Sequence, residues 1–569
     1  MSEPINHDLL ARIPLTARAI LDVGCGEGGL GVAYRRRNPR ARLFGIDRDH
    51  ARALAAAAVL DEVANVDLDR TPMPFPADTR LDCIIYGDVL EHLADPARVL
   101  RAHLRWLAED GCVLVCIPNV EHWSFAARLL DGSWRYEPSG LLDATHLRWF
   151  TTTSMRALLE EAGLNVLDVS SRVFDNGAHA AFVAAMTPSL TALGIDPADY
   201  AARSAPLQTV WRASRLAPRR LLVAAHQMRP QGGVSHVRIV YPQAAIGTDP
   251  SMSVALITDG MLPEIAVSVP KILILHRMTL AGAAGRRSLR GLLASGWMVV
   301  SECDDHPDFL ARMQTDDLLS FTGVHAVQTS TEALAEVLRA RNPHVMVFPN
   351  TIREIQPPRN FTDPARLGLF FGAFNREADW QDWMPALNQV LALAGERMPV
   401  TVMHDRAFFD ALSTPHKNFL PMSDHPTYLD QLAGCEVSLM PLTDTAFNRT
   451  KSDLKFIEAA AARVLAIASP TVYGASIDDG RTGFVVDGPS ALAARLAELL
   501  NDPARGRDIA DRARAEVVEK RMLADQVGAR VRWYQQLWDR RAELTLELLA
   551  RVPDLGADPA TPARVEIGS

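Results

Sequence analysis

A short stretch near the start of the chain, AILDVGCGEGGL at residues 19–30, constrains the fold more than any other. It opens on a mostly apolar run, as expected of a buried parallel strand. Glycines follow at once, and a helix-like segment begins at Leu30. Glycines at such a turn let the backbone approach a ligand closely, which a Cβ atom would prevent. Strand, glycine turn and helix together predict the start of a nucleotide-binding βαβ unit.

Two further strands supply acidic residues to the same region. A predicted strand at residues 41–46 ends in Asp47, about 20 residues beyond the glycine turn, where a carboxylate can accept both hydroxyls of a ribose. Another apolar strand, at residues 81–86, leads into Asp88, Glu91 and His92. A glycine loop alone is compatible with a nicotinamide cofactor, a flavin or S-adenosylmethionine. The spacing here is GxGxG rather than GxGxxG, which disfavours a nicotinamide-dependent dehydrogenase.

The whole pattern over residues 15–175 resembles class I S-adenosylmethionine-dependent methyltransferases. DVGCGEG is similar to their first motif, and DVLEHL to the segment after their fourth strand. The resemblance implies S-adenosylmethionine as cofactor, with Asp47 on its ribose and Asp67 on the adenine side. The cofactor-binding residues it implies are Gly24, Gly26, Gly28, Asp47, Asp67 and Asp88. The alternative is a Rossmann-like domain that binds no cofactor.

The methyl acceptor is expected near residues 120–150, which are less regular and rich in aromatic residues and histidines. GLLDATHLRWFT resembles a motif of methyltransferases from bacterial polysaccharide pathways, although a packed aromatic turn is an equal alternative. Methylation of a hydroxyl needs a base, and imidazole has a suitable pKa. His146 is the first candidate, with Asp143 beside it, and His92 and His122 are alternatives. No metal-ligand cluster stands out in the sequence.

Length and composition limit the remaining possibilities. A chain of 569 residues predicts three or four domains. A net charge of −9 argues against broad binding of nucleic acid. The six cysteines are scattered without a CxxC pair, so neither a zinc knuckle nor a disulfide framework is indicated. The sequence shows no signal peptide and no apolar run of about 18 residues, so we expect a cytoplasmic protein without a transmembrane segment.

Residues 181–216 are rich in alanine, proline and arginine, and they predict a linker after a methyltransferase domain at residues 1–180. Arg212, Arg215, Arg219 and Arg220 form a basic run. It is either a solvated linker helix or a surface that faces anionic lipid, so peripheral membrane contact stays open.

A second alternation of strands and helices begins at Arg220 and pauses at residues 349–351, and a third begins at Leu367. Two successive Rossmann-like halves resemble a GT-B glycosyltransferase. The predicted fold class is therefore α/β, with a Rossmann-like methyltransferase domain followed by a GT-B pair of Rossmann-like domains. Residues 217–350 would be the N-terminal acceptor half, residues 351–551 the donor half with the C-terminal helices, and residues 552–569 a tail.

A local resemblance supports this interpretation. The segment at residues 447–486, FNRTKSDLKFIEAAAARVLAIASPTVYGASIDDGRTGFVV, is similar to the donor-binding motif of the retaining, group 1-like glycosyltransferases. Glu458 matches the glutamate that holds the donor ribose. Lys451 and Lys455 precede it by seven and three residues, positions that share a face on a helix. They could neutralise the diphosphate as it leaves, with Lys451 in the catalytic role. Gly372, Asn375 and Arg376 follow the first strand of this half, and Arg376 is a second phosphate candidate.

The sequence departs from that motif at one position. Many members carry a glutamate eight residues before the ribose glutamate, where this chain has Thr450. Glu302, Asp304 and Asp305 follow a strand of the acceptor half and either face the cleft or are solvated. We therefore expect a bifunctional enzyme of bacterial surface glycan synthesis. It would methylate a sugar hydroxyl and transfer sugar from a nucleotide-sugar to a glycan acceptor, lipid-linked or not. The alternative is a methyltransferase with a non-catalytic nucleotide- or glycan-binding module, which Thr450 favours.

Overall fold

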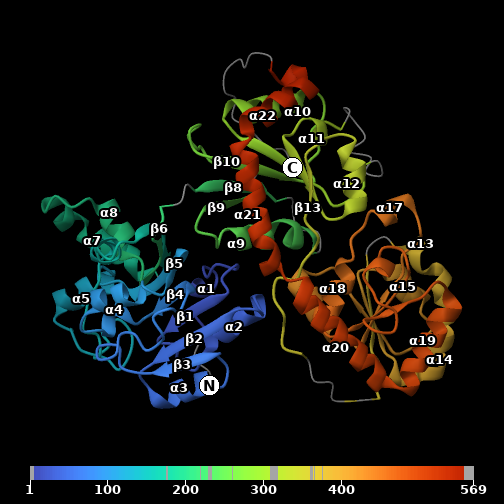
Figure 1. Ribbon diagram of the computed structural model, residues 1–569, viewed down its shortest axis with the longest axis horizontal. Coiled ribbons are helices and arrows are strands. Elements are labelled where there is room, and N and C mark those ends of the chain that lie inside the picture. Colours follow the sequence, from blue (N-terminus) through green and yellow to red (C-terminus); the bar gives the residue numbers. More distant parts are fainter. Residues whose placement is uncertain are drawn as a thin grey trace. The chain divides into compact units, whose positions relative to one another are not determined.

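The computed structural model describes residues 5–174, 177–217, 220–227, 233–258, 261–307, 318–358, 363, 365–373 and 376–556. The chain forms two compact units. Unit 1 comprises residues 1–219 with 248–251, and unit 2 comprises residues 220–247 and 252–569. Unit 1 contains one sheet and unit 2 contains two, each flanked by helices (Figure 1).

The sheet of unit 1 has the strand order β3-β2-β1-β4-β5-β7-β6. The first five strands in this order are parallel, whereas β7 runs antiparallel to both β5 and β6. The order reverses between β1 and β4, and ligands of such sheets bind where the carboxyl ends of the strands meet that reversal. The strands are β1 (Ala19–Val23), β2 (Arg42–Asp47), β3 (Glu62–Asn65), β4 (Leu81–Gly87), β5 (Leu107–Pro118), β6 (Asn165–Arg172) and β7 (Gln208–Ser214).

Helices cover both faces of this sheet, because a parallel sheet buries both of its faces. They are α1 (His7–Leu10), α2 (Gly29–Arg37), α3 (His50–Ala57), α4 (Pro96–His103), α5 (Trp123–Asp131), α6 (Thr152–Glu161), α7 (Ala178–Ala192) and α8 (Pro197–Ser204), with a 3-10 turn η1 (Leu90–His92). The Asp95 side chain caps α4, accepting from the Arg98 N–H. The helix ends at His103, and Leu107 begins β5.

The predicted linker at residues 181–216 is wrong. Those residues contain most of α7, all of α8 and β7, and β7 lies between β5 and β6 in the sheet. Trp211 is fully buried there. Arg212, predicted to lie in a basic surface run, is instead buried and donates two hydrogen bonds to Asp168, at 2.6 and 2.8 Å. The long-range antiparallel pairing that orders this segment leaves no local sequence pattern.

Unit 2 contains two six-stranded sheets, and every pair of neighbouring strands in them is parallel. The first has the order β13-β12-β11-β10-β8-β9 and the second β16-β15-β14-β17-β18-β19. Both are doubly wound orders with one reversal. The predicted α/β class, with one Rossmann-like sheet followed by two further Rossmann-like sheets, is thus confirmed. The strands are β8 (Leu221–His226), β9 (Met252–Ile257), β10 (Lys271–His276), β11 (Met298–Glu302), β12 (Ala326–Thr329), β13 (Val345–Val347), β14 (Leu369–Gly372), β15 (Val400–Met403), β16 (Lys417–Leu420), β17 (Val437–Met440), β18 (Leu465–Ala468) and β19 (Phe484–Val485).

The helices of unit 2 include two that carry the chain back from the second half to the first. The α-helices of unit 2 within the described residues are α9 (Tyr241–Ile246), α10 (Gly282–Ala294), α11 (Leu319–Thr322), α12 (Glu332–Arg339), α13 (Glu377–Trp380), α14 (Met384–Ala394), α15 (Arg406–Ala411), α16 (His425–Ala433), α17 (Ala446–Arg449), α18 (Leu454–Ala461), α19 (Pro489–Asn501), α20 (Pro503–Lys520), α21 (Leu523–Asp539) and α22 (Arg541–Arg551). Helix α21 packs on α9 and β10 of the first half (Figure 1).

The sequence analysis predicted that the C-terminal helices all belong to the donor half, and this is wrong for the last of them. Leu548, Val552 and Leu555 are buried in the hydrophobic core of the first half. Residues 552–556 are therefore part of the fold, and the predicted tail is wrong for them, while residues 557–569 lie outside the described residues. None of the helices in the described part of the chain is long and apolar enough to cross a membrane.

Candidate functional site

The glycine turn of unit 1 follows the carboxyl end of β1. Gly24, Gly26 and Gly28 have φ values of 73°, 53° and 83°, in the left-handed region that side chains disfavour. A Cβ atom on Gly24 would lie 2.5 Å from Cγ2 of Val89, so this position requires glycine sterically as well. The predicted glycine loop is thus a compact turn at the edge of the sheet where the strand order reverses.

Asp47, at the carboxyl end of β2, joins this turn. Its Oδ2 accepts the Gly26 N–H at 2.9 Å and its Oδ1 accepts the Asp49 N–H at 2.8 Å, and the residue is 7% exposed. Each carboxylate oxygen keeps a lone pair for a ligand hydroxyl. Asp67 follows β3, about half of its side chain is exposed, and it accepts the Asp69 N–H at 3.0 Å. Both predicted acids therefore follow the carboxyl ends of neighbouring parallel strands.

Asp88 is the first residue after β4, with a φ of 55°. Its Oδ1 accepts a hydrogen bond of 2.5 Å from Nε2 of Gln208, a residue of β7. Burial raises the pKa of Asp88 to about 6, against the lowering effects of Arg172 and Gln208. Gln208, which lies in the predicted linker, is thus a direct hydrogen-bond partner of Asp88, a predicted cofactor-binding residue.

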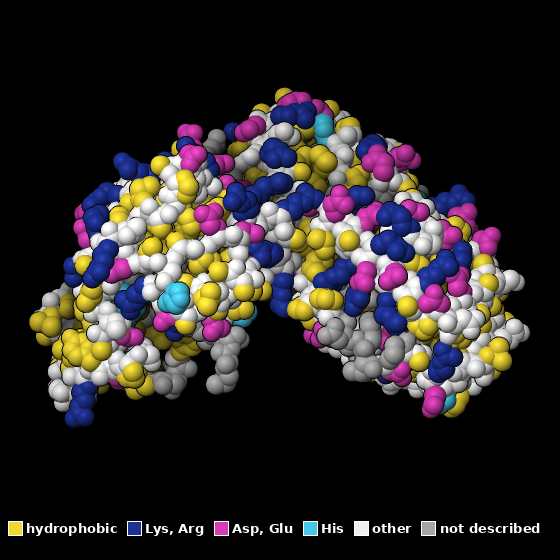
Figure 2. Space-filling view, turned by 60° about the horizontal axis from the view of Figure 1, so that its bottom comes forward, with side chains coloured by type: hydrophobic (Ala, Val, Ile, Leu, Met, Phe, Trp, Pro, Cys, Tyr) yellow, Lys and Arg dark blue, Asp and Glu magenta, His cyan; other side chains and the backbone are white. Residues whose placement is uncertain are grey.

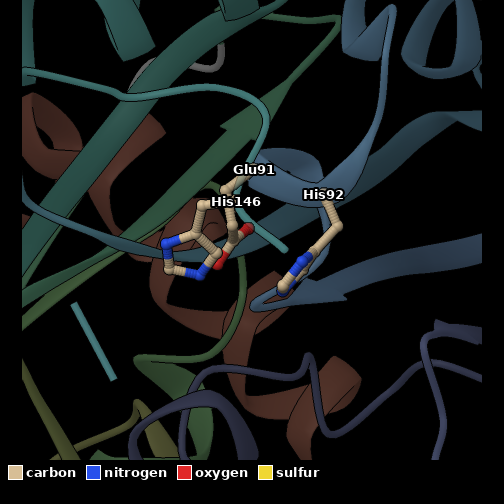
Figure 3. A group of neighbouring side chains, drawn as sticks. All are labelled: Glu91, His92 and His146. Atoms are coloured by element: carbon tan, nitrogen blue, oxygen red, sulfur yellow. The ribbon is translucent and has the colours of Figure 1, made fainter. Parts of the chain in front are cut away.

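Three side chains that the sequence separates by up to 55 residues, Glu91, His92 and His146, lie close together (Figure 3). Glu91 and His92 come from the turn η1, and His146 from the loop before α6. Their ligand atoms all lie within 4.8 Å of one another. Glu91 is 1% exposed, and neither of its carboxylate oxygens has a hydrogen-bond partner within the described residues. Burial, and then the charge of Asp88, raises its pKa well above the ordinary value.

A buried carboxylate without a partner is costly, so a proton or a cation must balance it. Two imidazoles and one carboxylate are the ligands of many divalent metal sites. The sequence analysis found no such cluster, because only tertiary structure brings His146 to Glu91. The backbone N–H groups of Leu147 and Arg148 hold that loop in place by donating to the Glu91 carbonyl oxygen at 2.8 and 3.0 Å.

Asp143 contacts both histidines: its backbone carbonyl oxygen accepts from the His146 N–H at 3.1 Å, and its side chain reaches His92 through Thr145. The Thr145 hydroxyl donates to Asp143 at 2.7 Å and lies 3.0 Å from Nδ1 of His92. Because that hydroxyl proton is already given to Asp143, Nδ1 of His92 must be the donor to it. The remaining nitrogen of His92, Nε2, is then an acceptor that can bind a metal ion.

His146 contacts both His92 and a group of aromatic rings. Its ring centroid is 4.8 Å from that of His92 and 5.5 Å from that of Trp149, which in turn contacts Phe125 and Trp134. Burial, followed by His92, lowers the pKa of His146. His122, the third candidate, caps α5 through Ser124, and burial lowers its pKa to about 4. A pKa that low makes His122 a weak base.

In unit 2, three of the predicted donor-binding residues surround the carboxyl end of β14. Lys455 of α18 donates from Nζ to the Gly372 carbonyl oxygen at 2.5 Å. Burial, and then Arg376, lowers the pKa of Lys455 to about 7. Arg376 donates to Asp379 at 3.0 Å and to Asn448 at 3.2 Å. Asn375 lies outside the described residues.

Glu458 and Lys451 have partners that sequence analysis did not identify. Oε1 of Glu458 lies 2.7 Å from Nε2 of His425, and both side chains are about 95% buried. Lys451 precedes α18, so the helical spacing that predicted a shared face with Glu458 does not apply to it. Its Nζ is 3.2 Å from Oδ1 of Asp305, in the first half of unit 2. Asp305 therefore faces the second half, one of the two placements expected.

A cavity of about 760 Å³ in unit 2 adjoins the start of α18. Its lining includes Arg449, Lys451 and Ser452 of the second half, Thr331 and Phe348 of the first, and Arg521 where the chain returns. Residues of both halves thus line an open pocket that includes Lys451, one of the predicted donor residues.

Comparison with known proteins identifies unit 1. Residues 4–169 match the family model described as a methyltransferase domain. A ubiquinone biosynthesis O-methyltransferase of Cereibacter sphaeroides strain ATCC 17025 is 30% identical over 180 residues, which are 30% of this chain and 69% of the relative. This chain belongs to the methyltransferase family. The same enzyme from strain ATCC 17029 is 28% identical over 176 residues, with the same coverage.

The solved structures similar to this methyltransferase match it less closely. TarM is 11% identical, has a TM-score of 0.36, and covers 47% of this chain and 54% of its own. A SAM-dependent methyltransferase from Archaeoglobus fulgidus is 15% identical, has a TM-score of 0.25, and covers 36% of this chain and 89% of its own. The description of unit 2 as two doubly wound halves rests on its own strand orders.

The raised pKa of Asp88 predicts a pH-dependent stability. Folding favours the protonated carboxyl, so this stabilisation is present below about pH 4 and is lost as the pH rises through about 6. Asp88→Asn keeps a residue type that tolerates positive φ and removes the titration. Above pH 6, we expect the free energy of unfolding of the variant to exceed that of the wild type by up to about 3 kcal/mol. Urea denaturation between pH 4 and 7 measures this, with exposed Asp67→Asn as the control. Equal pH slopes in wild type and Asp88→Asn would contradict the assignment.

Proposed function

We propose that unit 1 transfers the methyl group of S-adenosylmethionine to a hydroxyl group, and that unit 2 transfers sugar from a nucleotide-sugar donor. The observation that carries the first part is the group of Glu91, His92 and His146, next to Asp88 at the edge of a methyltransferase sheet. A thioether leaving group needs no acid, whereas a hydroxyl acceptor must lose its proton. The group supplies what that proton loss requires.

The cofactor is assigned to the glycine turn, Asp47, Asp67 and Asp88. Gly26 and Asp47 are already joined by a hydrogen bond, which fixes the carboxylate beside the turn before a ligand arrives. Such preorganisation lowers the entropic cost of binding.

Replacement of Asp47 tests this cofactor site. Asp47→Asn keeps the size of the side chain and an oxygen acceptor, but it loses the negative charge that strengthens hydrogen bonds donated by the ribose hydroxyls. Charge-assisted hydrogen bonds contribute roughly 1.5–3 kcal/mol, so we expect affinity for S-adenosylhomocysteine to fall about tenfold or more. Calorimetry measures it, and Asp61→Asn, on the amino-terminal side of β3, is the control. Unchanged affinity of Asp47→Asn would remove Asp47 from the site.

The proton can leave the acceptor in two ways that use the same residues. In one, His146 is the general base, as the sequence analysis proposed. In the other, Glu91, Nε2 of His92 and His146 hold a divalent cation. A cation there would lower the pKa of a bound hydroxyl. The carboxyl group of Glu91, partnerless among the described residues and close to two imidazoles, favours the second, because a base mechanism at His146 gives Glu91 no role.

Glu91→Gln distinguishes the two. If the residues hold a cation, the variant should lose metal affinity in calorimetry with Mn²⁺ or Zn²⁺, and methyl transfer should fall by about 10²-fold or more. The wild type should also lose activity on chelation and regain it when metal is added. If His146 acts alone as base, chelation and Glu91→Gln should have little effect, whereas His146→Ala should lower turnover 10²–10⁴-fold. Affinity for S-adenosylhomocysteine should be unchanged in both variants, which serves as the folding control.

A sugar hydroxyl is the proposed acceptor, because fused domains commonly serve one pathway and unit 2 is assigned to sugar transfer. Rings of Trp149 and Trp134 near His146 suit the apolar face of a sugar. A phenolic hydroxyl is the second candidate, since the same rings suit a planar acceptor and the similar curated enzymes are ubiquinone O-methyltransferases. Bacterial surface glycan synthesis, a lipid-linked acceptor and a cytoplasmic location with peripheral membrane contact remain part of the proposal. On the face shown in Figure 2, cationic and anionic side chains are interspersed, which is consistent with the absence of a nucleic-acid partner from this proposal.

The donor site of unit 2 is assigned to Gly372, Arg376, Lys451, Lys455 and Glu458. Four of these five residues carry charges that match a nucleoside diphosphate, with cations for the phosphates and Glu458 for the ribose. The alternative is a non-catalytic binding module, which Thr450 supports because it stands where many similar enzymes carry a glutamate. The Thr450 hydroxyl donates to the Phe447 carbonyl oxygen at 2.8 Å.

The two assignments within the donor site differ in their kinetic effects. Lysine near the leaving diphosphate would act mainly in the transition state, so Lys451→Ala should lower turnover. Glu458→Ala should weaken donor and transition state alike, and therefore raise the apparent donor constant. Mass spectrometry of products formed from labelled S-adenosylmethionine and a set of nucleotide-sugars measures both reactions. Methyl transfer to a pre-glycosylated acceptor should survive both changes. Binding of nucleotides by the wild type without sugar transfer to any acceptor would favour the non-catalytic module.

A further inference from the structure

The charged residues assigned to the donor are already engaged with protein groups inside unit 2. Lys455 donates to the Gly372 carbonyl oxygen and Arg376 pairs with Asp379, both within the second half. Lys451 instead pairs with Asp305 of the first half. This ion pair is the contact that distinguishes Lys451 from the other cations of the site.

Asp305 lies just beyond the carboxyl end of β11, between two cations. Its Oδ2 is 2.8 Å from Nη2 of Arg277, and its Oδ1 is 3.2 Å from Nζ of Lys451. The side chains of Asp305 and Lys451 are 18% and 19% exposed, so solvent screens the pair only partly. Arg277 has a second acid, Asp304, at 2.5 Å, so its charge remains balanced without Asp305.

The residues on both sides of Lys451 also contact the first half or the segment that leaves it. The Thr450 carbonyl oxygen accepts from the Thr331 hydroxyl at 2.8 Å. The Ser452 hydroxyl accepts from Nδ2 of Asn350 at 2.7 Å. Three consecutive residues between α17 and α18 are thus bound to groups outside the second half, with the Lys451 ion pair as the charged member.

A second contact between the halves reaches Glu458. The Tyr241 hydroxyl of the first half lies 3.2 Å from Nδ1 of His425, whose Nε2 meets Glu458 at 2.7 Å. The His425 ring packs so closely on the backbone of Gly233 that a Cβ atom there would lie 2.6 Å from it. Both ends of the assigned donor site, the lysine and the ribose glutamate, are therefore covered by residues of the first half.

We propose that Asp305 stands in for a donor phosphate at Lys451, so that this structure is a latched form of unit 2 from which the nucleotide must displace Asp305. The inference rests on the proposed donor site. A carboxylate and a phosphate oxygen make the same charge-assisted bond to an ammonium group, so the two compete for Lys451. Part of the free energy of donor binding is consequently used to break the contact between the halves. The apparent affinity for the donor is then the intrinsic affinity multiplied by the fraction of molecules in the open form.

Neutralising Asp305 tests the latch. Calorimetry on the full chain with UDP, GDP, ADP, CDP and TDP compares wild type, Asp305→Asn and Asp304→Asn. Asp304→Asn is a matched control, because it removes the same charge from the adjacent position and leaves the ion pair with Lys451 in place. We expect Asp305→Asn to bind the preferred diphosphate about tenfold more tightly than wild type, the size of one charge-assisted bond. Asp304→Asn should stay within about twofold of wild type.

The other outcomes each have a definite meaning. Equal or weaker binding by Asp305→Asn overturns the latch while leaving the donor site in place, and weaker binding would make Asp305 a donor contact. Equal strengthening by both variants also overturns it, since long-range charge alone would then explain the gain. If wild type and variants bind none of the five diphosphates, the donor site itself fails. Asp305→Ser, measured in parallel, guards against a folding defect specific to asparagine.

Discussion

A parallel sheet buries both faces, so its chemistry is confined to the ends of its strands. This constraint organises the three sheets that the described residues form, two of them wholly parallel and one parallel over five of its strands. In unit 1 the glycine turn, Asp47 and Asp88 each follow a strand at the carboxyl edge, and Glu91 lies one turn further on. In unit 2, Asp305 and Lys455 lie at the corresponding edges of the two sheets. Helices exclude water from the faces, and so charges placed at these edges lie in a partly dehydrated environment.

Charges in such surroundings must be balanced, and the two units do this differently. In the first half of unit 2, Arg238 and Glu302 are 1% and 0% exposed and form an ion pair of 2.8 Å. Asn350 and Gln328 complete their hydrogen bonds. Breaking such a pair by removing one partner would leave a buried charge uncompensated. Glu91 of unit 1 is buried to the same degree, yet its carboxylate has no partner among the described residues. That contrast is the physical reason for treating Glu91 as a ligand-binding residue and Glu302 as a structural one.

Sequence spacing predicts which residues lie together only within one local unit, as His146 and Lys451 illustrate. Gly24, Gly26, Gly28 and Asp47 were found from sequence because they belong to one βαβ unit, in which local order dictates spatial order. Lys451 and Glu458 were related by helical spacing, but the helix begins only at Leu454, so the relation failed for the lysine. His146 was proposed for the chemistry of imidazole, within the segment GLLDATHLRWFT and with Asp143 beside it. Its neighbours Glu91 and His92 come from a distant turn, and no spacing rule connects them.

The α/β class, the three successive sheets and the position of the glycine turn could be predicted from the residues, since they follow from short-range alternation of apolar strands, loops and helices. Only the folded structure shows that Gln208–Ser214 enters the first sheet between two earlier strands, because its antiparallel pairing with β5 joins residues 90 to 102 positions apart and leaves no local pattern. It also decided that α22 returns to the first half of unit 2, where Leu548 completes a core. Above all, it brought Glu91 to His146 and Asp305 to Lys451. Contacts of charged side chains across such distances depend on how whole sheets are covered and joined, which residue spacing does not encode.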